Sequence, residues 1–388
     1  MKLFKHSLKA RILWLLASCL ALVISSPFAG LQAQKSRDET HSTWRWEHSD
    51  DGLKRRFEVQ GKAEFTDDYT DIKSVSEGGW VIIEEHRDRE SYRYEVRRDA
   101  TGQIVRAYFV NGTSQPLDAS AQSWLAKFVL DAVRQGGLDA EKRVQKILRE
   151  RGVSGVLAEI DQISGDYAKR RYYQELIKQG NLDANALRDV LRQVARDVSS
   201  DYEQAQLLIA VAPMLTGKEA AVQPFFDAVA TIKSGYEHSR VLKTVLKQGS
   251  PSRALLVLIA SSTQRIPSDY EKAGVLKQVA GAYLDNPTLR EAFFQSVASI
   301  KSDYEQRGVL TALVKSGTQS EEVLRLLLDS AATMSSDYEK ATFLISVSNV
   351  YTGDTRLKSA FLKAVETIKS DYERGRVLSV LLKNKQIS

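Results

Sequence analysis

The chain has 388 residues, a formal net charge of +6 and one cysteine, Cys19. A single cysteine excludes an internal disulfide framework, so packing must stabilise the fold, and a chain of this length can bury a sufficient core. Four cations and no acid lie in residues 1–11, so without residues 1–33 the net charge is only +2. The charge balance therefore gives no support to nucleic-acid binding.

Residues 1–33 have the layout of a secretory signal peptide. A cationic start precedes the apolar run Ile12–Gly30, and the pattern predicts cleavage after Ala33. An uncleaved anchor is one alternative, and a lipidated Cys19 in the lipobox-like Leu16-Ala17-Ser18-Cys19 is another. We expect a periplasmic or secreted protein, with an inner-membrane anchor as the alternative, that contacts the membrane only through this segment.

Residues 41–117 alternate between apolar and polar side chains, which predicts an antiparallel sheet domain with one solvated face. The clearest stretch is Arg56–Phe65, which we expect to form one strand of a simple meander. Further strands are expected at Trp44–His48, Asp71–Ser76, Trp80–Glu85, Tyr92–Arg97 and Ile104–Val110.

Residues 118–163 are predicted to form a helical connector that packs on the sheet. A helix over about Ser120–Arg134 carries Trp124 and Phe128 for the apolar face. Helices over about Ala140–Arg151 and Ser154–Ile163 are expected to lead into the C-terminal half.

Residues 164–388 repeat the tetrapeptide Ser-Asp-Tyr-Glu, or a close variant of it. Its tyrosines are Tyr167, Tyr202, Tyr236, Tyr270, Tyr304, Tyr338 and Tyr372, which recur at a constant interval after a first interval that is longer by one. A fixed period of about 34 residues is typical of stacked helical hairpins. We therefore predict an α+β protein, in which the antiparallel β domain precedes an all-α solenoid of about six and a half hairpins.

Each complete motif has the pattern of a capping box, in which Ser and Glu satisfy backbone N–H groups at a helix start. The six predicted boxes are Ser200 with Glu203, Ser234 with Glu237, Ser268 with Glu271, Ser302 with Glu305, Ser336 with Glu339, and Ser370 with Glu373. The motif Asp would complement the helix macrodipole at the first helical position, and only Gly235 departs from this rule.

Alternate units share features at twice the period of the motif. They are the aromatic or apolar pairs Phe225-Phe226, Phe293-Phe294 and Phe361-Leu362, and the dipeptides Ile232-Lys233, Ile300-Lys301 and Ile368-Lys369. The true repeat is therefore predicted to be a pair of hairpins.

Several segments together resemble the extracytoplasmic region that follows the peptidase in some bacterial BlaR-type membrane metallopeptidases. They are Gly61–Phe65 with Asp71-Ile72, Gly79–Glu84, Trp124-Leu125-Ala126, Arg143-Val144 and the Ser-Asp-Tyr-Glu units. The resemblance covers most of residues 44–388, but the chain has neither a His-Glu-x-x-His motif nor a multi-helix membrane part. It implies an envelope sensor or binding region without proteolysis.

The repeat tyrosines have two interpretations. We expect them to pack against neighbouring units, and the alternative is an exposed aromatic row for a partner. The polar positions after the motif vary, as recognition residues would: Gln204, Gln206, His238, Arg240, Lys272, Gln306, Arg307, Lys340, Thr342, Arg374 and Arg376. They are either an ordinary solvated face or a mostly cationic ladder for an acidic or extended partner. The candidate partner-binding cations are Arg240, Lys272, Arg307, Lys340, Arg374 and Arg376.

No pattern in the sequence indicates catalysis. Asp67, Asp68 and Asp71 are interpreted as a charged turn rather than a Ca²⁺ loop, and the histidines show no metal-ligand spacing. Neither a nucleophile elbow nor a phosphate loop occurs, so no catalytic residue, metal or cofactor is predicted. We expect a noncatalytic protein that binds a protein or peptide in the bacterial envelope as a sensor or scaffold. The alternatives are a hydrolase that acts through the β domain and a purely structural envelope component.

Overall fold

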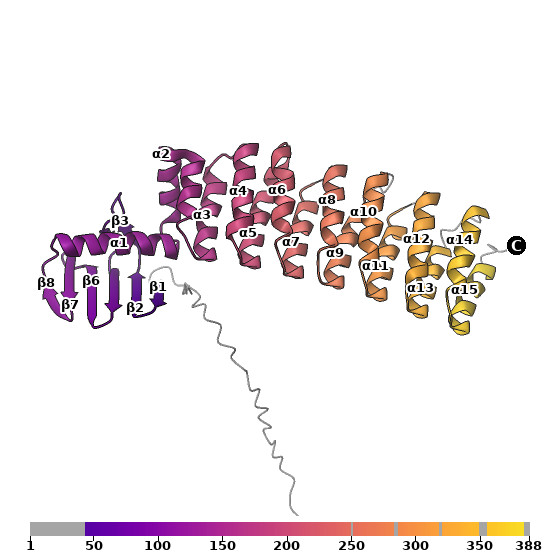
Figure 1. Ribbon diagram of the computed structural model, residues 1–388, viewed down its shortest axis with the longest axis horizontal. Helices are drawn as coiled ribbons and strands as arrows, with labels where there is room; N and C mark the ends of the chain where they lie inside the picture. Colours follow the sequence, from indigo (N-terminus) through magenta and orange to yellow (C-terminus); the bar gives the residue numbers. More distant parts are fainter. Residues whose placement is uncertain (1–42, 250, 283–285, 318–319, 349–354, 384–388) are drawn as a thin grey trace, which may run out of the picture.

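The computed structural model describes residues 43–249, 251–282, 286–317, 320–348 and 355–383. The predicted targeting segment, residues 1–33, lies outside this part of the chain. No helix in the described ranges has both the length and the hydropathy that a membrane span requires. A sheet domain lies at one end of a long row of paired helices (Figure 1), which confirms the predicted α+β fold and the solenoid.

The main sheet has six antiparallel strands in the order β1-β2-β5-β6-β7-β8. The strands are β1 (Thr43–Asp50), β2 (Leu53–Gln60), β5 (Trp80–Arg87), β6 (Glu90–Arg98), β7 (Ile104–Val110) and β8 (Thr113–Gln115). β3 (Ala63–Phe65) and β4 (Ile72–Val75) form a separate two-stranded ribbon.

The prediction of one continuous strand over Arg56–Phe65 is wrong. The chain turns at Gly61, whose φ of 77° is readily available only to glycine. Gly79 approaches the same turn so closely that a Cβ atom there would lie 2.8 Å from the Gln60 carbonyl oxygen. β2 therefore pairs with β5, and the ribbon between them folds away from the meander.

Helix α1 (Ala119–Gly136) lies across the strands (Figure 1) and packs on the apolar face of the main sheet. Trp46, Phe57 and Tyr94 from the sheet are buried with Leu125 and Phe128 from the helix. Alternation along each strand brings the apolar side chains to this one face. The predicted coverage of the sheet by a helix is confirmed.

Helix α2 (Ala140–Ile160) contains a non-helical residue, Gly152, with φ 66° and ψ −166°. This break lies between the two helices that the sequence predicts. The carboxylate of Glu159, which is 3% exposed, accepts hydrogen bonds from Arg134 of α1 at 2.7 Å and Arg143 of α2 at 2.6 Å. These guanidinium groups outweigh the effect of burial, which opposes ionisation, and hold the pKa of Glu159 below its usual range. Glu159 thus joins the helix on the sheet to the start of the solenoid.

The described part of the solenoid comprises six hairpins and one further helix. Its helices are α3 (Asp166–Gln179), α4 (Ala184–Asp197), α5 (Asp201–Val211), α6 (Glu219–Val229), α7 (Gly235–Leu246), α8 (Arg253–Thr263), α9 (Asp269–Val279), α10 (Pro287–Ala298), α11 (Asp303–Lys315), α12 (Glu321–Thr333), α13 (Asp337–Ser348), α14 (Thr355–Glu366) and α15 (Asp371–Lys383). The odd-numbered helices form one layer and the even-numbered helices form the other (Figure 1).

The even-numbered layer shows the predicted pairing of hairpins. α6 packs closely on α4, α10 on α8 and α14 on α12, whereas α6 and α10 make few contacts with the even-numbered helices that follow them. The close packing uses the aromatic pairs, because Phe225 of α6 and Phe293 of α10 are fully buried. Between α6 and α8 the looser spacing leaves a cavity of about 550 Å³, lined in part by Leu215, Val222 and Leu258.

Half of each predicted capping box is confirmed. In all six motifs the Ser hydroxyl accepts a hydrogen bond from the Glu backbone N–H at 3.3–3.4 Å. The reciprocal bond is not formed within the described chain, because the Glu carboxylates pair with basic side chains instead. The pairs between adjacent units are Glu203 with Arg170, Glu271 with Lys243, Glu305 with Lys277, and Glu339 with Arg307. Glu237 pairs with Arg240 and Glu373 with Arg376 inside their own units.

The motif Asp has a role that the macrodipole argument did not predict. Its carboxylate accepts two backbone N–H bonds, at 2.6–3.1 Å, from the residues that open the motif of the next unit; we call this arrangement the aspartate clamp. The clamps are formed by Asp166, Asp201, Asp269, Asp303 and Asp337. The Ser backbone N–H, which the capping box would give to Glu, is therefore bonded to the preceding unit.

The exception at Gly235 follows from the same geometry. A clamp at this position would bind the backbone N–H groups of residues 267 and 268, but residue 267 is a proline and has no N–H. Gly235 and Pro267 are therefore a matched pair that replaces one clamp.

Candidate functional site

The motif tyrosines of the six complete units are exposed. Tyr202, Tyr236, Tyr270, Tyr304, Tyr338 and Tyr372, here called the tyrosine row, are between 53% and 74% exposed. The expectation that these six tyrosines pack against neighbouring units is therefore wrong; they form an exposed aromatic row, and its use for a partner stays a prediction. Each is the second residue of an odd-numbered helix, so the row follows one edge of the solenoid.

Helical geometry explains this exposure. Leu313 of α11 is buried and lies nine residues after Tyr304, which is about two and a half turns. Tyr304 therefore points away from the apolar stripe that the helix buries. The angle about the helix axis between each tyrosine and the apolar stripe of its helix can be worked out from the sequence. This angle would have predicted that the tyrosines are exposed.

The tyrosine row accounts for nearly all of the large hydrophobic side chains that the described part of the chain exposes. Apart from these six residues, only Leu382 is in this class, with 63% exposure. Isolated exposed apolar residues are normal on a soluble protein, but a repeated exposed set marks a candidate interaction site.

Arginine side chains lie against three of the six rings. The guanidinium of Arg240 lies 5.8 Å from the Tyr236 ring centroid, and that of Arg307 lies 5.2 Å from the Tyr304 centroid. Arg376 lies 5.6 Å from the ring of Tyr338 in the preceding unit. The same three arginines pair with motif glutamates, so each connects a ring to the capped end of a helix. Within the described residues, the row's hydroxyls have no hydrogen-bond partner.

The predicted cationic ladder is wrong in part. Lys272 and Lys340 are only 7% and 4% exposed, and their ammonium groups donate to the carbonyl oxygens of Ser299 and Thr367 at 2.9 and 3.0 Å. Burial lowers the pKa of both lysines. Arg374, which holds the same position in the last unit, donates to the Ile368 carbonyl oxygen at 2.9 Å. Lys272 and Lys340 therefore stabilise the turn that ends their own unit instead of forming an open ladder, whereas Arg374, with its side chain 39% exposed, bonds the turn just before its own helix.

Neutral side chains at the same position bond either the turn that ends the unit or the last turn of its second helix. Gln204 donates to the Thr231 hydroxyl at 2.6 Å, and His238 lies 2.9 Å from the Ser262 hydroxyl. Both side chains are 1% exposed, and burial lowers the pKa of His238 to about 4. Of the predicted binding cations, Arg240, Arg307 and Arg376 remain beside the tyrosine row, with side chains 28%, 22% and 32% exposed.

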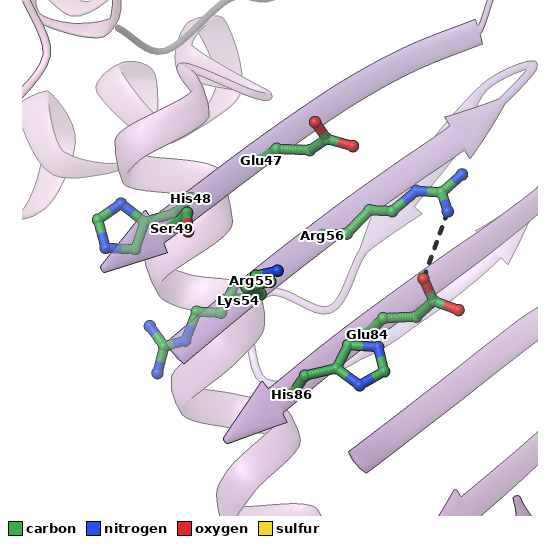
Figure 2. A pocket seen from close by; sticks show the side chains of 8 residues that line it. All are labelled: Glu47, His48, Ser49, Lys54, Arg55, Arg56, Glu84 and His86. Carbon is green, nitrogen blue, oxygen red and sulfur yellow. Dashed lines mark hydrogen bonds and ion pairs between the residues drawn. The ribbon is translucent and has the colours of Figure 1, made fainter. Parts of the chain in front are cut away.

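The β domain has a charged pocket of about 500 Å³ at the end of strands β1, β2 and β5. Figure 2 shows Arg56 reaching across to Glu84, and the two groups form an ion pair at 3.4 Å. Glu84 also pairs with Arg93. His48 and Ser49 are consecutive on a strand, so they project to opposite faces. Among the eight residues that line this pocket, no hydrogen bond joins a histidine to a serine or a carboxylate. The arrangement is an ion-pair network across the solvated face.

The turn at Asp67, Asp68 and Asp71 is bonded both within itself and to strand β6. The Asp71 carboxylate accepts hydrogen bonds from the Tyr94 hydroxyl and the Ile72 backbone N–H, both at 2.7 Å. No group of three or more residues that could hold a metal occurs in the described ranges.

Comparison with known proteins returned no match for this chain, whether to a family model, a curated protein or a solved structure.

Proposed function

We propose that this protein is an exported, noncatalytic binding protein of the bacterial envelope, and that its solenoid captures a protein or peptide partner along the tyrosine row. The observation that carries the proposal is the exposure of the same aromatic residue in six successive units. A sensor or scaffold role is part of the proposal, and the resemblance to BlaR-type metallopeptidases implies the sensor or binding role.

The physical properties of the row support binding to an extended partner. A solenoid presents equivalent side chains at a fixed spacing, so a partner that runs along the edge can contact several units. Tyrosine and arginine are the side chains that contribute most at protein interfaces, because they combine a large contact area with a polar end. In three of the six units the contact with arginine limits the motion of the ring, which reduces the freedom that this ring would lose on binding.

Site-specific photocrosslinking in the native host tests this proposal. A photoreactive phenylalanine analogue is placed at Tyr304, and in a matched variant at Gln295, an exposed residue of α10 in the other helix layer. We expect Tyr304 to crosslink a discrete protein that Gln295 does not, and the yield to fall when Tyr270 and Tyr338 are replaced by Ser. Equal crosslinking from both positions, or none from Tyr304, would contradict the proposal.

A further inference from the structure

The packing of consecutive odd-numbered helices favours one backbone conformation for the partner. These helices contact one another directly, so we infer the spacing between successive tyrosines from the ordinary interaxial distance of packed helices, about 8–10 Å. A polyproline II helix has three residues per turn and rises about 3.1 Å per residue, so it advances about 9.3 Å per turn. An extended β-strand presents side chains on one face about every 6.6 Å, since each residue rises about 3.3 Å. An α-helix repeats about every 5.4 Å. Only the polyproline II repeat matches one unit of the solenoid.

The chemistry of the row fits the same conformation. A polyproline II backbone makes no internal hydrogen bonds, so its carbonyl oxygens need external donors. All six members of the row carry a hydroxyl, and none of these hydroxyls is bonded to another described residue. Each ring also offers an apolar surface, and aromatic surfaces are what proline rings pack against in proteins that recognise proline-rich segments.

We propose that the tyrosine row binds proline-rich segments in the polyproline II conformation, with one turn of peptide per solenoid unit. Six tyrosines then contact about 18 residues, and every third residue of the partner faces a ring. This inference rests on the proposed function, because it states the chemistry of the partner for the same edge.

Direct binding of the full chain to synthetic peptides tests this inference. The probes are fluorescein-labelled (Pro-Pro-Ala)n peptides with n of 2, 4 and 6, and (Gly-Ser-Ala)6 serves as a flexible control of equal length. We expect affinity, measured by fluorescence anisotropy, to rise at least tenfold from n of 2 to n of 6, because each added triplet engages another ring. Equal binding of the Gly-Ser-Ala peptide would overturn the inference.

Variants then connect binding to the row. Tyr270→Ser with Tyr304→Ser should weaken binding of (Pro-Pro-Ala)6 at least tenfold, whereas Leu382→Ser, which removes the exposed hydrophobic residue outside the row, should leave it within twofold. Should the double serine variant fail to fold, Tyr270→Phe with Tyr304→Phe keeps the rings, and we expect it to lose about threefold through the hydroxyls alone. Unchanged binding in a folded double variant would refute the role of the row.

A separate arm distinguishes this inference from the proposed function. Aromatic rows also stack on sugar rings, so chitohexaose and cellohexaose are titrated in the same assay. Binding of either sugar that depends on the tyrosines, without binding of (Pro-Pro-Ala)6, would overturn the inference. If neither probe binds but the Tyr304 crosslink persists, only the polyproline assignment fails. If the crosslink is also absent, the proposed function fails with it.

Discussion

The aspartate clamp can be tested by replacing Asp303 with Ala. The Asp303 carboxylate accepts N–H bonds from Ser335 at 2.9 Å and Ser336 at 2.6 Å. Asp371 has the same motif position in α15, but its side chain is 97% exposed and pairs only with Arg374, at 3.6 Å, among the described residues. Asp371→Ala is therefore a matched control, because it loses the helix-end charge without losing a clamp.

The two variants should differ in stability by about 2 kcal/mol. A hydrogen bond to a charged group contributes about 1.5–3 kcal/mol, and the freed amides of Ser335 and Ser336 regain contact with water, so two bonds together are worth about 2–3 kcal/mol. The interaction with the helix macrodipole, about 0.3–1 kcal/mol, is lost equally in both variants. We expect Asp303→Ala to cost about 3 kcal/mol and Asp371→Ala to cost less than about 1 kcal/mol.

Urea denaturation followed by circular dichroism measures the difference. Because repeat proteins can unfold unit by unit, amide hydrogen exchange at Ser335 and Ser336 provides a local measurement of the same loss. Faster exchange at these two amides is expected only in Asp303→Ala. Equal destabilisation by both variants would show that Asp acts through the helix macrodipole alone and would refute the clamp.

Three further predictions concern other contacts. Burial lowers the pKa of His238 to about 4, so the unfolded chain binds the proton more readily, and the stability present above pH 6.5 should be lost as the pH falls toward 4. The loss of stability between pH 7.5 and pH 5 should be about 2 kcal/mol in urea titrations. His238→Gln should remove this loss, since Gln204 and Gln306 occupy the same position in other units. An unchanged pH dependence in that variant would exclude His238 as the cause. Gly235→Asp with Pro267→Lys should restore a clamp, with a favourable coupling of at least about 1 kcal/mol in a double-mutant cycle, and strict additivity would contradict this. Glu159→Gln should lower the free energy of unfolding by about 3 kcal/mol, because Arg134 and Arg143 lose a buried partner. In calorimetry the β domain and the solenoid should then melt separately. A single unshifted transition would argue against this junction.

Much of the β domain could be predicted from local alternation, but its connectivity could not. The apolar positions of Arg56–Phe65 continue in register, so the sequence indicates one strand. The turn at Gly61 depends on the close approach of Gly79, which lies on the far side of the β3–β4 ribbon in the sequence. Alternation reports which face a residue occupies and does not report which strand lies next to it.

The candidate site could likewise be predicted only in part from the sequence. The tyrosines, the cations and their period are visible in the sequence, yet the exposure of the row and the burial of Lys272 and Lys340 depend on packing between helices. Gln306 and Arg307 are consecutive polar residues after the motif. Gln306 is 5% exposed, whereas Arg307 lies beside the Tyr304 ring with its side chain 22% exposed, and only the orientation of the helix in the stack separates them.

By itself, the sequence determined the period of the hairpins, the helix starts and the pairing of alternate units, because caps and apolar stripes are local patterns that repeat whenever the same hairpin repeats. The tertiary structure alone decided the partners of the motif. Asp binds backbone N–H groups at the start of the next unit, and Glu often pairs with a cation of the unit before. These partners become neighbours only after the units stack, so the motif that starts each helix also joins it to the next unit.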